Sequence, residues 1–122
     1  MRTKQTDAFE KFIRKKKFIK DDLINYPGLE HPELRRVLTE KINMIAEEFR
    51  KIHSSDKPLI KNYLYQIAKG LKSFNNFHLD TEDKERLCLY IEELMDIVDL
   101  ESSDGLLNTF VYGFDPNGIQ NN

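Results

Sequence analysis

Apolar residues recurring every three or four positions predict three long helices. The clearest covers residues 32–53, where six apolar side chains fall on an arc of about 80° around the helix axis. They are Leu34, Leu38, Ile42, Ile45, Phe49 and Ile52. Pro32 suits the first helical position, because the N–H that proline lacks is not needed there. This helix is expected to present one narrow apolar face to a core.

A second helix is predicted from about Lys57-Pro58 to Asn75-Asn76, with Ser55 or Asp56 as its N-cap. Its apolar positions are Ile60, Leu64, Ile67, Leu71 and Phe74. Gly70 interrupts the pattern, although glycine costs about 1 kcal/mol relative to alanine inside a helix. The close approach of a neighbouring backbone would explain a glycine at this position.

The third helix is predicted from Asp80 or Thr81 to Leu100, with Asp80 as its N-cap. Its inner stripe consists of Leu87, Ile91, Leu94 and Val98, and Tyr90 and Ile97 widen it. Cys88 lies about 60° outside this stripe. A free cysteine usually behaves as a small apolar side chain, so a neighbouring helix is a natural cover for it.

A shorter helix is predicted at the N-terminus, capped by Thr6 or Asp7. Its apolar face consists of Phe9, Phe12 and Ile13. Residues 18–31 then form a long connection that includes the turn sequence Asn25-Tyr26-Pro27-Gly28. The side chains expected to hold this connection against the core are Phe18, Ile19, Leu23 and Leu29.

Two structures are compatible with residues 105–114. Leu106, Leu107, Phe110 and Val111 make a helical face that Gly113 would end. Residues 109–114 could instead form a strand, because they are rich in β-branched and aromatic side chains. We favour the helix, since no partner strand is evident. Residues 116–122 are expected to be a frayed tail.

These elements predict an all-α fold: a three- to four-helix bundle, packed antiparallel, with a short C-terminal capping segment. The length of 122 residues suits one domain spanning residues 1–122. No segment approaches the roughly 20 apolar residues of a membrane span, and a single cysteine excludes an intrachain disulfide. The composition is that of a small bacterial domain, and we expect it in the cytoplasm.

Charge is distributed unevenly, although the formal net charge is only −2. Residues 1–20 hold eight basic and two acidic residues, whereas residues 87–122 hold seven acidic residues and no lysine or arginine. This asymmetry motivates the first functional hypothesis, a non-enzymatic protein-interaction module with a basic partner. The candidate binding residues are Glu92, Glu93, Asp96, Asp99, Phe110, Tyr112 and Phe114. In the alternative interpretation, the acids form a solvated helix face and the aromatic residues pack on their own bundle.

Paired carboxylates suggest a second hypothesis. Glu93 and Asp96 form an E-x-x-D pair, and carboxylates at this spacing can share a cation such as Mg²⁺. The pattern resembles that of all-α pyrophosphohydrolases, which combine an E-E-x-x-E segment with a later E-x-x-D. The resemblance implies a metal-dependent nucleotide hydrolase using Glu47, Glu48, Glu93 and Asp96. The sequence departs from that pattern at Lys51, which stands where the third carboxylate belongs.

A basic run is the one part of the sequence suited to nucleic acid or an anionic surface. It consists of Lys11, Arg14, Lys15, Lys16 and Lys17. The negative net charge of the whole chain argues against nucleic-acid binding outside this run. The alternative is a solvated helix end that pairs with the acidic C-terminal third.

Common catalytic motifs are absent from the sequence. It contains no phosphate-binding glycine loop and no G-x-S-x-G elbow, and its three histidines are far apart in the chain. No cofactor is therefore expected, and the sequence favours a binding protein over an enzyme.

Overall fold

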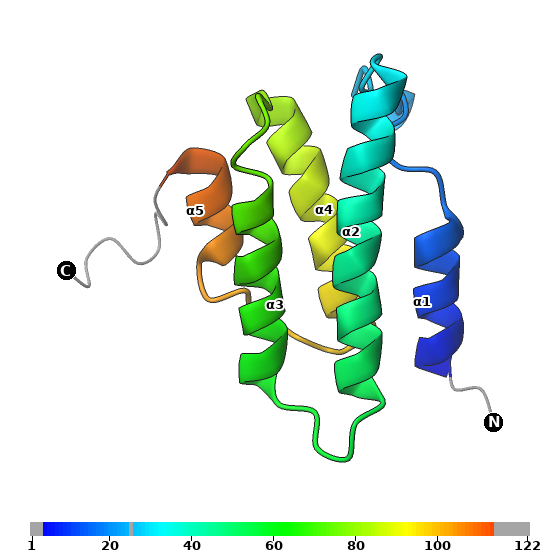
Figure 1. Ribbon diagram of the computed structural model, residues 1–122, viewed down its shortest axis with the longest axis vertical. Coiled ribbons are helices and arrows are strands. Elements are labelled where there is room, and N and C mark those ends of the chain that lie inside the picture. Colours follow the sequence, from blue (N-terminus) through cyan, green and yellow to red (C-terminus); the bar gives the residue numbers. More distant parts are fainter. Residues whose placement is uncertain (1–3, 25, 114–122) are drawn as a thin grey trace.

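The computed structural model describes residues 4–24 and 26–113, which contain five α-helices and no strand. The helices are α1 (Lys4–Arg14), α2 (Pro32–His53), α3 (Ile60–Ser73), α4 (Thr81–Ile97) and α5 (Leu106–Tyr112). A 3₁₀ turn, η1 (Asp22–Ile24), lies between α1 and α2. Consecutive helices run in opposite directions (Figure 1). None of the helices in the described ranges combines the length and apolarity needed to cross a membrane.

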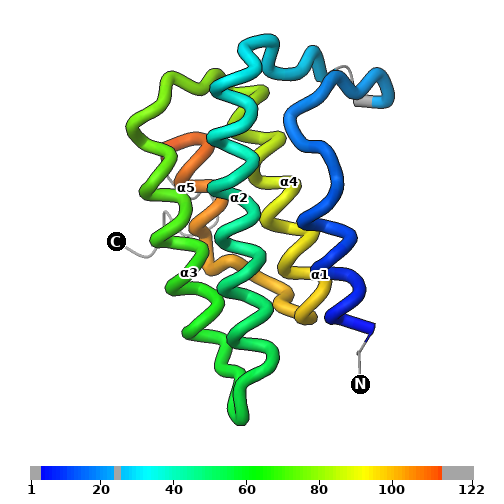
Figure 2. The backbone as a smooth tube through the Cα atoms, turned by 45° about the vertical axis from the view of Figure 1, so that its right-hand side comes forward, coloured from blue at the N-terminus to red at the C-terminus, as the bar shows by residue number. Residues whose placement is uncertain are grey.

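The helices form two layers. α1, α2 and α3 lie side by side, and α4 and α5 pack behind them (Figures 1 and 2). α2 is central, because it contacts α1, α3 and α4, whereas α5 contacts α3 and α4. The all-α prediction is thus confirmed. The predicted count of three to four helices with a cap matches only roughly, because α1 is a full member of the bundle and the cap is a fifth helix.

The predicted apolar stripes supply most of the core. Their fully buried members include Leu38, Ile42, Phe49, Ile67, Leu87, Ile91 and Leu94. Ile60 is an exception, because it lies at the first residue of α3 and points into solvent. Gly70 lets α2 and α3 approach closely: a Cβ there would lie 2.4 Å from Cδ1 of Ile45. The atoms closest to Gly70 therefore belong to the Ile45 side chain, and not to a neighbouring backbone as the sequence suggested.

Local signals explain some helix starts and not others. Pro32 opens α2 as predicted, and Nδ1 of His31 accepts a hydrogen bond from the Leu34 N–H at 3.2 Å. Asp80 caps α4 as predicted, accepting from the Asp83 N–H at 2.8 Å. The prediction for α3 is wrong, because Leu59 occupies its N-cap without a side-chain hydrogen bond.

Two further predicted caps are also wrong. Ser55, proposed with Asp56 to start α3, lies four residues before the N-cap Leu59 and donates its hydroxyl to the Ile52 carbonyl at 2.6 Å. Thr6 and Asp7 lie inside α1, which is already helical at Lys4. For α3 the packing of the helices, and not a polar side chain, decides where the helix begins.

The connection between α1 and α2 is held differently from the prediction. Phe18 is buried and Leu29 packs against the core, as expected, but Leu23 is 95% exposed and Ile19 is 39% exposed. Their place is taken by Tyr26, which is buried and exchanges two backbone hydrogen bonds of 2.9 Å with Asp21. These two bonds close a loop around η1.

The short helix predicted near the C-terminus is present as α5, and the strand alternative is wrong. Gly113 ends α5 in the left-handed region at φ 84°, with its N–H bonded to the Thr109 carbonyl at 2.8 Å. α5 covers Cys88, which is therefore buried as a small apolar side chain. Phe114 and the predicted frayed tail at 116–122 lie outside the described residues.

Candidate functional site

A groove of about 220 Å³ runs between α4 and α5. Its lining residues from α4 are Glu85, Cys88, Leu89 and Glu92, and those from α5 are Leu107, Asn108, Val111 and Tyr112. Glu92 and Tyr112 were both candidates from the sequence, and the fold brings them to the same groove. Leu89 and Tyr112 keep 42% and 55% of their surfaces exposed, so the groove offers apolar area to solvent.

Negative charge surrounds this apolar surface. Burial, followed by the carboxylates of Glu92 and Glu85, raises the pKa of the Cys88 thiol to about 12. The thiol is therefore protonated at neutral pH and is not an activated nucleophile. Its Sγ lies 3.9 Å from the Leu107 carbonyl, which fixes it against α5. The groove can bind a cation or a polar donor, but it holds no reactive group of its own.

The acidic surface continues from the groove toward the end of α4. Asp96 is exposed one turn beyond Glu92, and no basic residue occupies the last turn of this helix. Carboxylates are unfavourable near a helix C-terminus, where the macrodipole is negative, and like charges four residues apart repel each other. These acids therefore lower the stability of α4, and a bound cation would relieve both effects.

Asp99, another predicted binding residue, has a structural role. It adopts the left-handed conformation at φ 58° directly after the C-cap residue Val98. The Leu100 N–H then bonds to the Met95 carbonyl at 2.9 Å, and the Asp99 N–H bonds to the Asp96 carbonyl at 3.2 Å. This is the hydrogen-bond pattern of a Schellman motif, which usually has glycine at this position.

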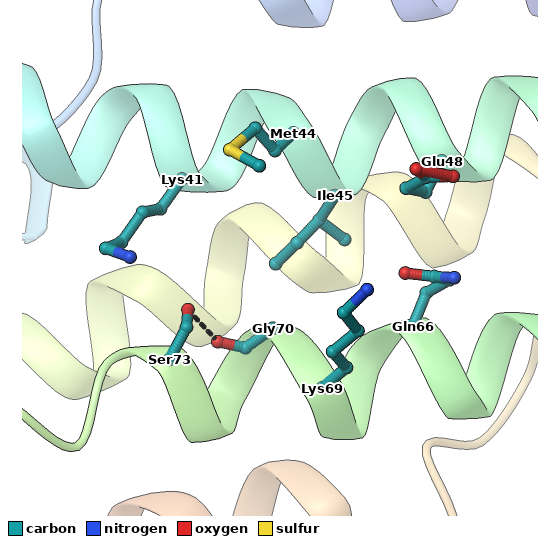
Figure 3. Close-up of a pocket in the computed structure, with 8 residues that line it drawn as sticks. All are labelled: Lys41, Met44, Ile45, Glu48, Gln66, Lys69, Gly70 and Ser73. Carbon is teal, nitrogen blue, oxygen red and sulfur yellow. Dashed lines mark hydrogen bonds between the residues drawn. The ribbon is translucent and has the colours of Figure 1, made fainter.

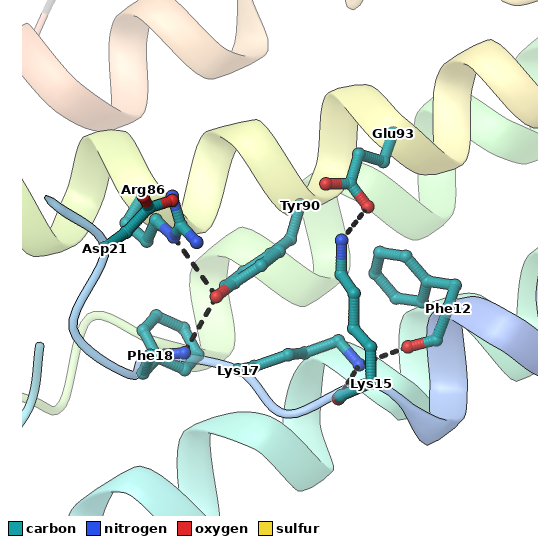
Figure 4. Close-up of polar contacts among 8 residues, drawn as sticks. All are labelled: Phe12, Lys15, Lys17, Phe18, Asp21, Arg86, Tyr90 and Glu93. Carbon is teal, nitrogen blue, oxygen red and sulfur yellow. Dashed lines mark hydrogen bonds and ion pairs between the residues drawn. The ribbon is translucent and has the colours of Figure 1, made fainter. Parts of the chain in front are cut away.

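The remaining predicted binding residues lie elsewhere. Glu93 points away from the groove and forms an ion pair with Lys15 of the segment after α1 (Figure 4). Phe110 faces inward, with its ring centroid 6.4 Å from that of Phe74 on the adjoining element. Phe114 lies outside the described residues. The sequence therefore places the acidic surface on α4. Only the fold shows which candidates line the groove and which, like Glu93 and Phe110, contact other parts of the bundle.

The carboxylates of the predicted metal site do not converge. Glu47 pairs with Arg50. Glu48 lies at the groove between α2 and α3 (Figure 3), and its carboxylate is 3.5 Å from the Lys51 ammonium group. Glu93 is held by Lys15 at the contact between α1 and α4 (Figure 4). Within residues 4–24 and 26–113, no three histidine, cysteine or acidic side chains form a group that could hold a metal ion. The geometry therefore gives the hydrolase hypothesis no support.

The α2–α3 groove is smaller, at about 140 Å³, and owes its shape to Gly70 (Figure 3). Two lysines and one glutamate line this groove, so cationic and anionic side chains are mixed there. They are Lys41, Lys69 and Glu48. The Ser73 hydroxyl donates to the Gly70 carbonyl at 2.6 Å and is therefore engaged within its own helix.

The basic run is divided between structural and exposed roles. Lys17 is only 2% exposed, and its ammonium group donates to the carbonyls of Phe12 and Lys15 (Figure 4). It thereby caps the C-terminus of α1, where Asn43 also donates to the Ile13 carbonyl at 3.2 Å. Burial, and then the charge of Lys15, lower the pKa of Lys17 to about 8. Of the other members, Lys11, Arg14 and Lys16 remain exposed.

A polar network that the sequence did not reveal joins the α1–α2 connection to α4 (Figure 4). The Tyr90 hydroxyl accepts the Phe18 N–H at 2.7 Å and Nε of Arg86 at 3.2 Å. Arg86 also forms a half-buried ion pair with Asp21 at 3.1 Å. Its guanidinium group lies between the rings of Tyr26 and Tyr90, at 5.3 and 5.2 Å from their centroids.

Asp83 completes this network from the first turn of α4. The Tyr26 hydroxyl donates to Asp83 at 2.9 Å, and burial together with this bond raises the pKa of the tyrosine. Burial also raises the pKa of the Asp83 carboxyl. Every group in the network has a protein partner, which is typical of a structural contact and leaves no group free for chemistry. The only sequence signal for it was the four-residue spacing of Arg86 and Tyr90.

The fold and its surfaces define the class of protein: a small, two-layered, all-α domain with shallow surface grooves. A family described as "Domain of unknown function (DUF4844)" matches residues 1–115, and the chain belongs to this family. The crystal structure of a DUF3571 family protein from Acinetobacter baumannii AYE is similar, with a TM-score of 0.80 and 33% sequence identity. That similarity covers 94% of this chain and 91% of the Acinetobacter chain. The comparison with curated proteins gave no match.

Proposed function

We propose that the protein is a non-enzymatic binding module that holds a cationic, partly apolar segment of a partner protein in the α4–α5 groove. The observation that carries this proposal is the combination, in one groove, of exposed apolar surface with the carboxylates of Glu85 and Glu92. Aromatic and apolar groups at the centre of a contact, with charge at its rim, are typical of protein interfaces.

The charge on α4 favours a cation over other occupants. Glu92 and Asp96 repel each other along the helix, and Asp96 also lies near the negative end of its dipole. No cation of the described residues pairs with either carboxylate. A lysine or arginine of the partner would neutralise both, and complementary charge of this kind accelerates association and sets specificity.

The size of the groove favours a side chain over a whole small molecule. Sites for drug-sized ligands usually enclose about 300–1,000 Å³, whereas this groove holds about 220 Å³. One apolar side chain could rest against Leu89 and Tyr112 while a basic residue one turn away reaches Glu92. An amphipathic basic helix provides this pairing at a spacing of three or four residues.

The experiment uses an amphipathic peptide with arginine and leucine at that spacing, labelled for fluorescence anisotropy. We expect binding in roughly the micromolar range that weakens about tenfold or more in the double variant Glu92→Lys/Asp96→Lys. The matched control, Glu30→Lys/Asp56→Lys, changes the net charge equally at exposed sites outside the groove and should bind like the wild type. Raising the salt concentration should weaken binding to the wild type.

Two results would contradict the proposal. One is equal loss of affinity in the groove variant and the control, which would show attraction to net charge alone. The other is the absence of binding by a peptide in which arginine and leucine have this spacing. Amide chemical shifts of the labelled protein provide an independent check, since the shifts should concentrate on the facing residues of α4 and α5.

A further inference from the structure

A larger pocket lies between residues 16–19 and the N-terminal half of α2. It holds about 440 Å³. Four cationic side chains line it, together with one carboxylate: Lys16, Lys17, Arg35, Arg36 and Glu40. The pocket therefore combines part of the basic run with two arginines that lie far from it in the sequence.

The single carboxylate does not neutralise the positive charge of the four cationic side chains that line the pocket. Glu40 lies 2.8 Å from Nη1 of Arg36, and Glu33 pairs with the same guanidinium group. Arg36 is thus already compensated, whereas Lys16, Lys17 and Arg35 have no carboxylate partner among the described residues. The uncompensated positive charge of the pocket comes from these three side chains.

Two of these three cations are held in place by the fold. Lys17 is almost fully buried, and its ammonium group donates to two backbone carbonyls and lies 4.3 Å from the Phe12 ring centroid, so it contributes positive charge beside the pocket and not an exposed donor. Arg35 donates from Nη1 to the Leu29 carbonyl at 3.2 Å, so its guanidinium group is oriented while its other donors stay available. Burial, and then the nearby charge of Lys15, lower the pKa of Lys17 to about 8, and the Glu93 carboxylate partly opposes this effect.

We propose that this pocket binds a small phosphate monoester. A phosphate group carries close to two negative charges at neutral pH and offers three acceptor oxygens, which matches the uncompensated cations, and Thr39 also lines the pocket. The volume exceeds that of a bare anion and falls within the usual range for small organic ligands. Ile19 and Pro32 add apolar surface against which the organic part can pack. This site is separate from the α4–α5 groove and does not depend on the function proposed for it.

The test follows amide chemical shifts of the full chain during titration with phenyl phosphate, with inorganic phosphate and benzyl alcohol as comparison ligands. We expect saturable shifts confined to residues 16–19 and 33–40, and tighter binding of phenyl phosphate than of either comparison ligand. Lys16→Gln, at an exposed position, should weaken binding about threefold or more, and Arg35→Gln about tenfold or more. Lys57→Gln and Lys61→Gln, which remove exposed lysines elsewhere, should leave binding unchanged.

Several outcomes would overturn the proposal. Shifts that do not saturate, or that spread over all lysine-bearing surfaces, would indicate unspecific attraction. Equal weakening by Lys16→Gln and Lys57→Gln would lead to the same conclusion, and Lys16→Gln remains decisive even if Arg35→Gln disturbs the contact with Leu29. Tighter binding of a short oligothymidylate at these same residues would assign the pocket to a nucleic-acid backbone, and the small-molecule proposal would be wrong.

Discussion

Lys17 combines a buried position with a charge, and the surrounding groups explain how the fold tolerates it. Two carbonyls at the end of α1 accept its protons, and the Phe12 ring lies 4.3 Å from its nitrogen. No carboxylate contacts it directly, because Glu93 is engaged by Lys15. The sequence showed four consecutive basic residues, but it could not show which of them turns inward. That choice depends on where α1 ends against α2 and α4.

The depressed pKa of Lys17 predicts a pH dependence of stability. The pKa is about 8 in the folded protein and 10.5 in the unfolded chain, so between these values only the unfolded chain retains the proton. The free energy of unfolding should therefore rise with pH in this window. Relative to the variant Lys17→Met, the wild type should gain about 2 kcal/mol between pH 7 and pH 10.

Chemical denaturation of both proteins across this range provides the measurement. The raised pKa values of Tyr26 and Cys88 act in the opposite direction above about pH 9, but they affect both proteins alike and cancel in the difference. Parallel stability curves for the two proteins would show that the Lys17 ammonium group is not desolvated in the folded state.

The C-terminus of α4 contains an unfavourable residue, and replacing it should stabilise the helix. Asp99 occupies the left-handed position of the Schellman motif, where glycine has no steric cost. Asp99→Gly should therefore raise the free energy of unfolding by about 0.5–1 kcal/mol, since it also removes an acid from the helix C-terminus. Glu92→Gly, inside the same helix, should lower it by about 1 kcal/mol. Urea denaturation measures both, and a destabilising Asp99→Gly would contradict this account.

The elements that the sequence predicted well are those determined by local chemistry. α2 has a proline at its start, and α4 has an aspartate whose side chain caps it, so both starts could be identified without the fold. α3 begins without a side-chain cap, and its start depends on packing against α2. The α1–α2 connection was the least predictable, because Tyr26 is buried only when Asp83 and Arg86 are brought beside it.

The candidate sites, like the helices, were predictable from the sequence only in part. Acidic residues on the solvent side of α4 followed from helical spacing, and Glu92 indeed lies at the groove. Spacing could not distinguish Glu93, which differs from Glu92 by one position and pairs with Lys15. The phosphate pocket was not predictable at all, since Lys16 and Arg35 meet only when the α1–α2 connection folds back onto α2.

For the whole molecule, the charge asymmetry of the sequence is only partly neutralised inside the fold. Among the described residues, the Lys15–Glu93 ion pair joins the basic run to the acidic helix, and it is too exposed to contribute more than about 1 kcal/mol. The two proposed sites use what remains: the acidic groove lies between α4 and α5, and the cationic pocket lies beside α2. Opposite charges are therefore presented by different parts of the bundle.

The Tyr90 hydroxyl joins the α1–α2 connection to α4, because it accepts hydrogen bonds from the Phe18 N–H and from Arg86. Tyr90→Phe leaves the buried Phe18 N–H without its acceptor and frees Arg86, which should lower the free energy of unfolding by about 1–3 kcal/mol. Tyr63→Phe is the matched control, because the Tyr63 hydroxyl has no hydrogen-bond partner among the described residues, and it should change stability by less than about 0.5 kcal/mol.

Hydrogen exchange then locates the effect of removing the Tyr90 hydroxyl. In Tyr90→Phe, the amides of Phe18 and Leu29 should exchange faster by a larger factor than those of α3, because the connection opens locally before the bundle unfolds. If all amides accelerated by the same factor, the hydroxyl would stabilise the whole bundle and would not specifically hold the connection against α4.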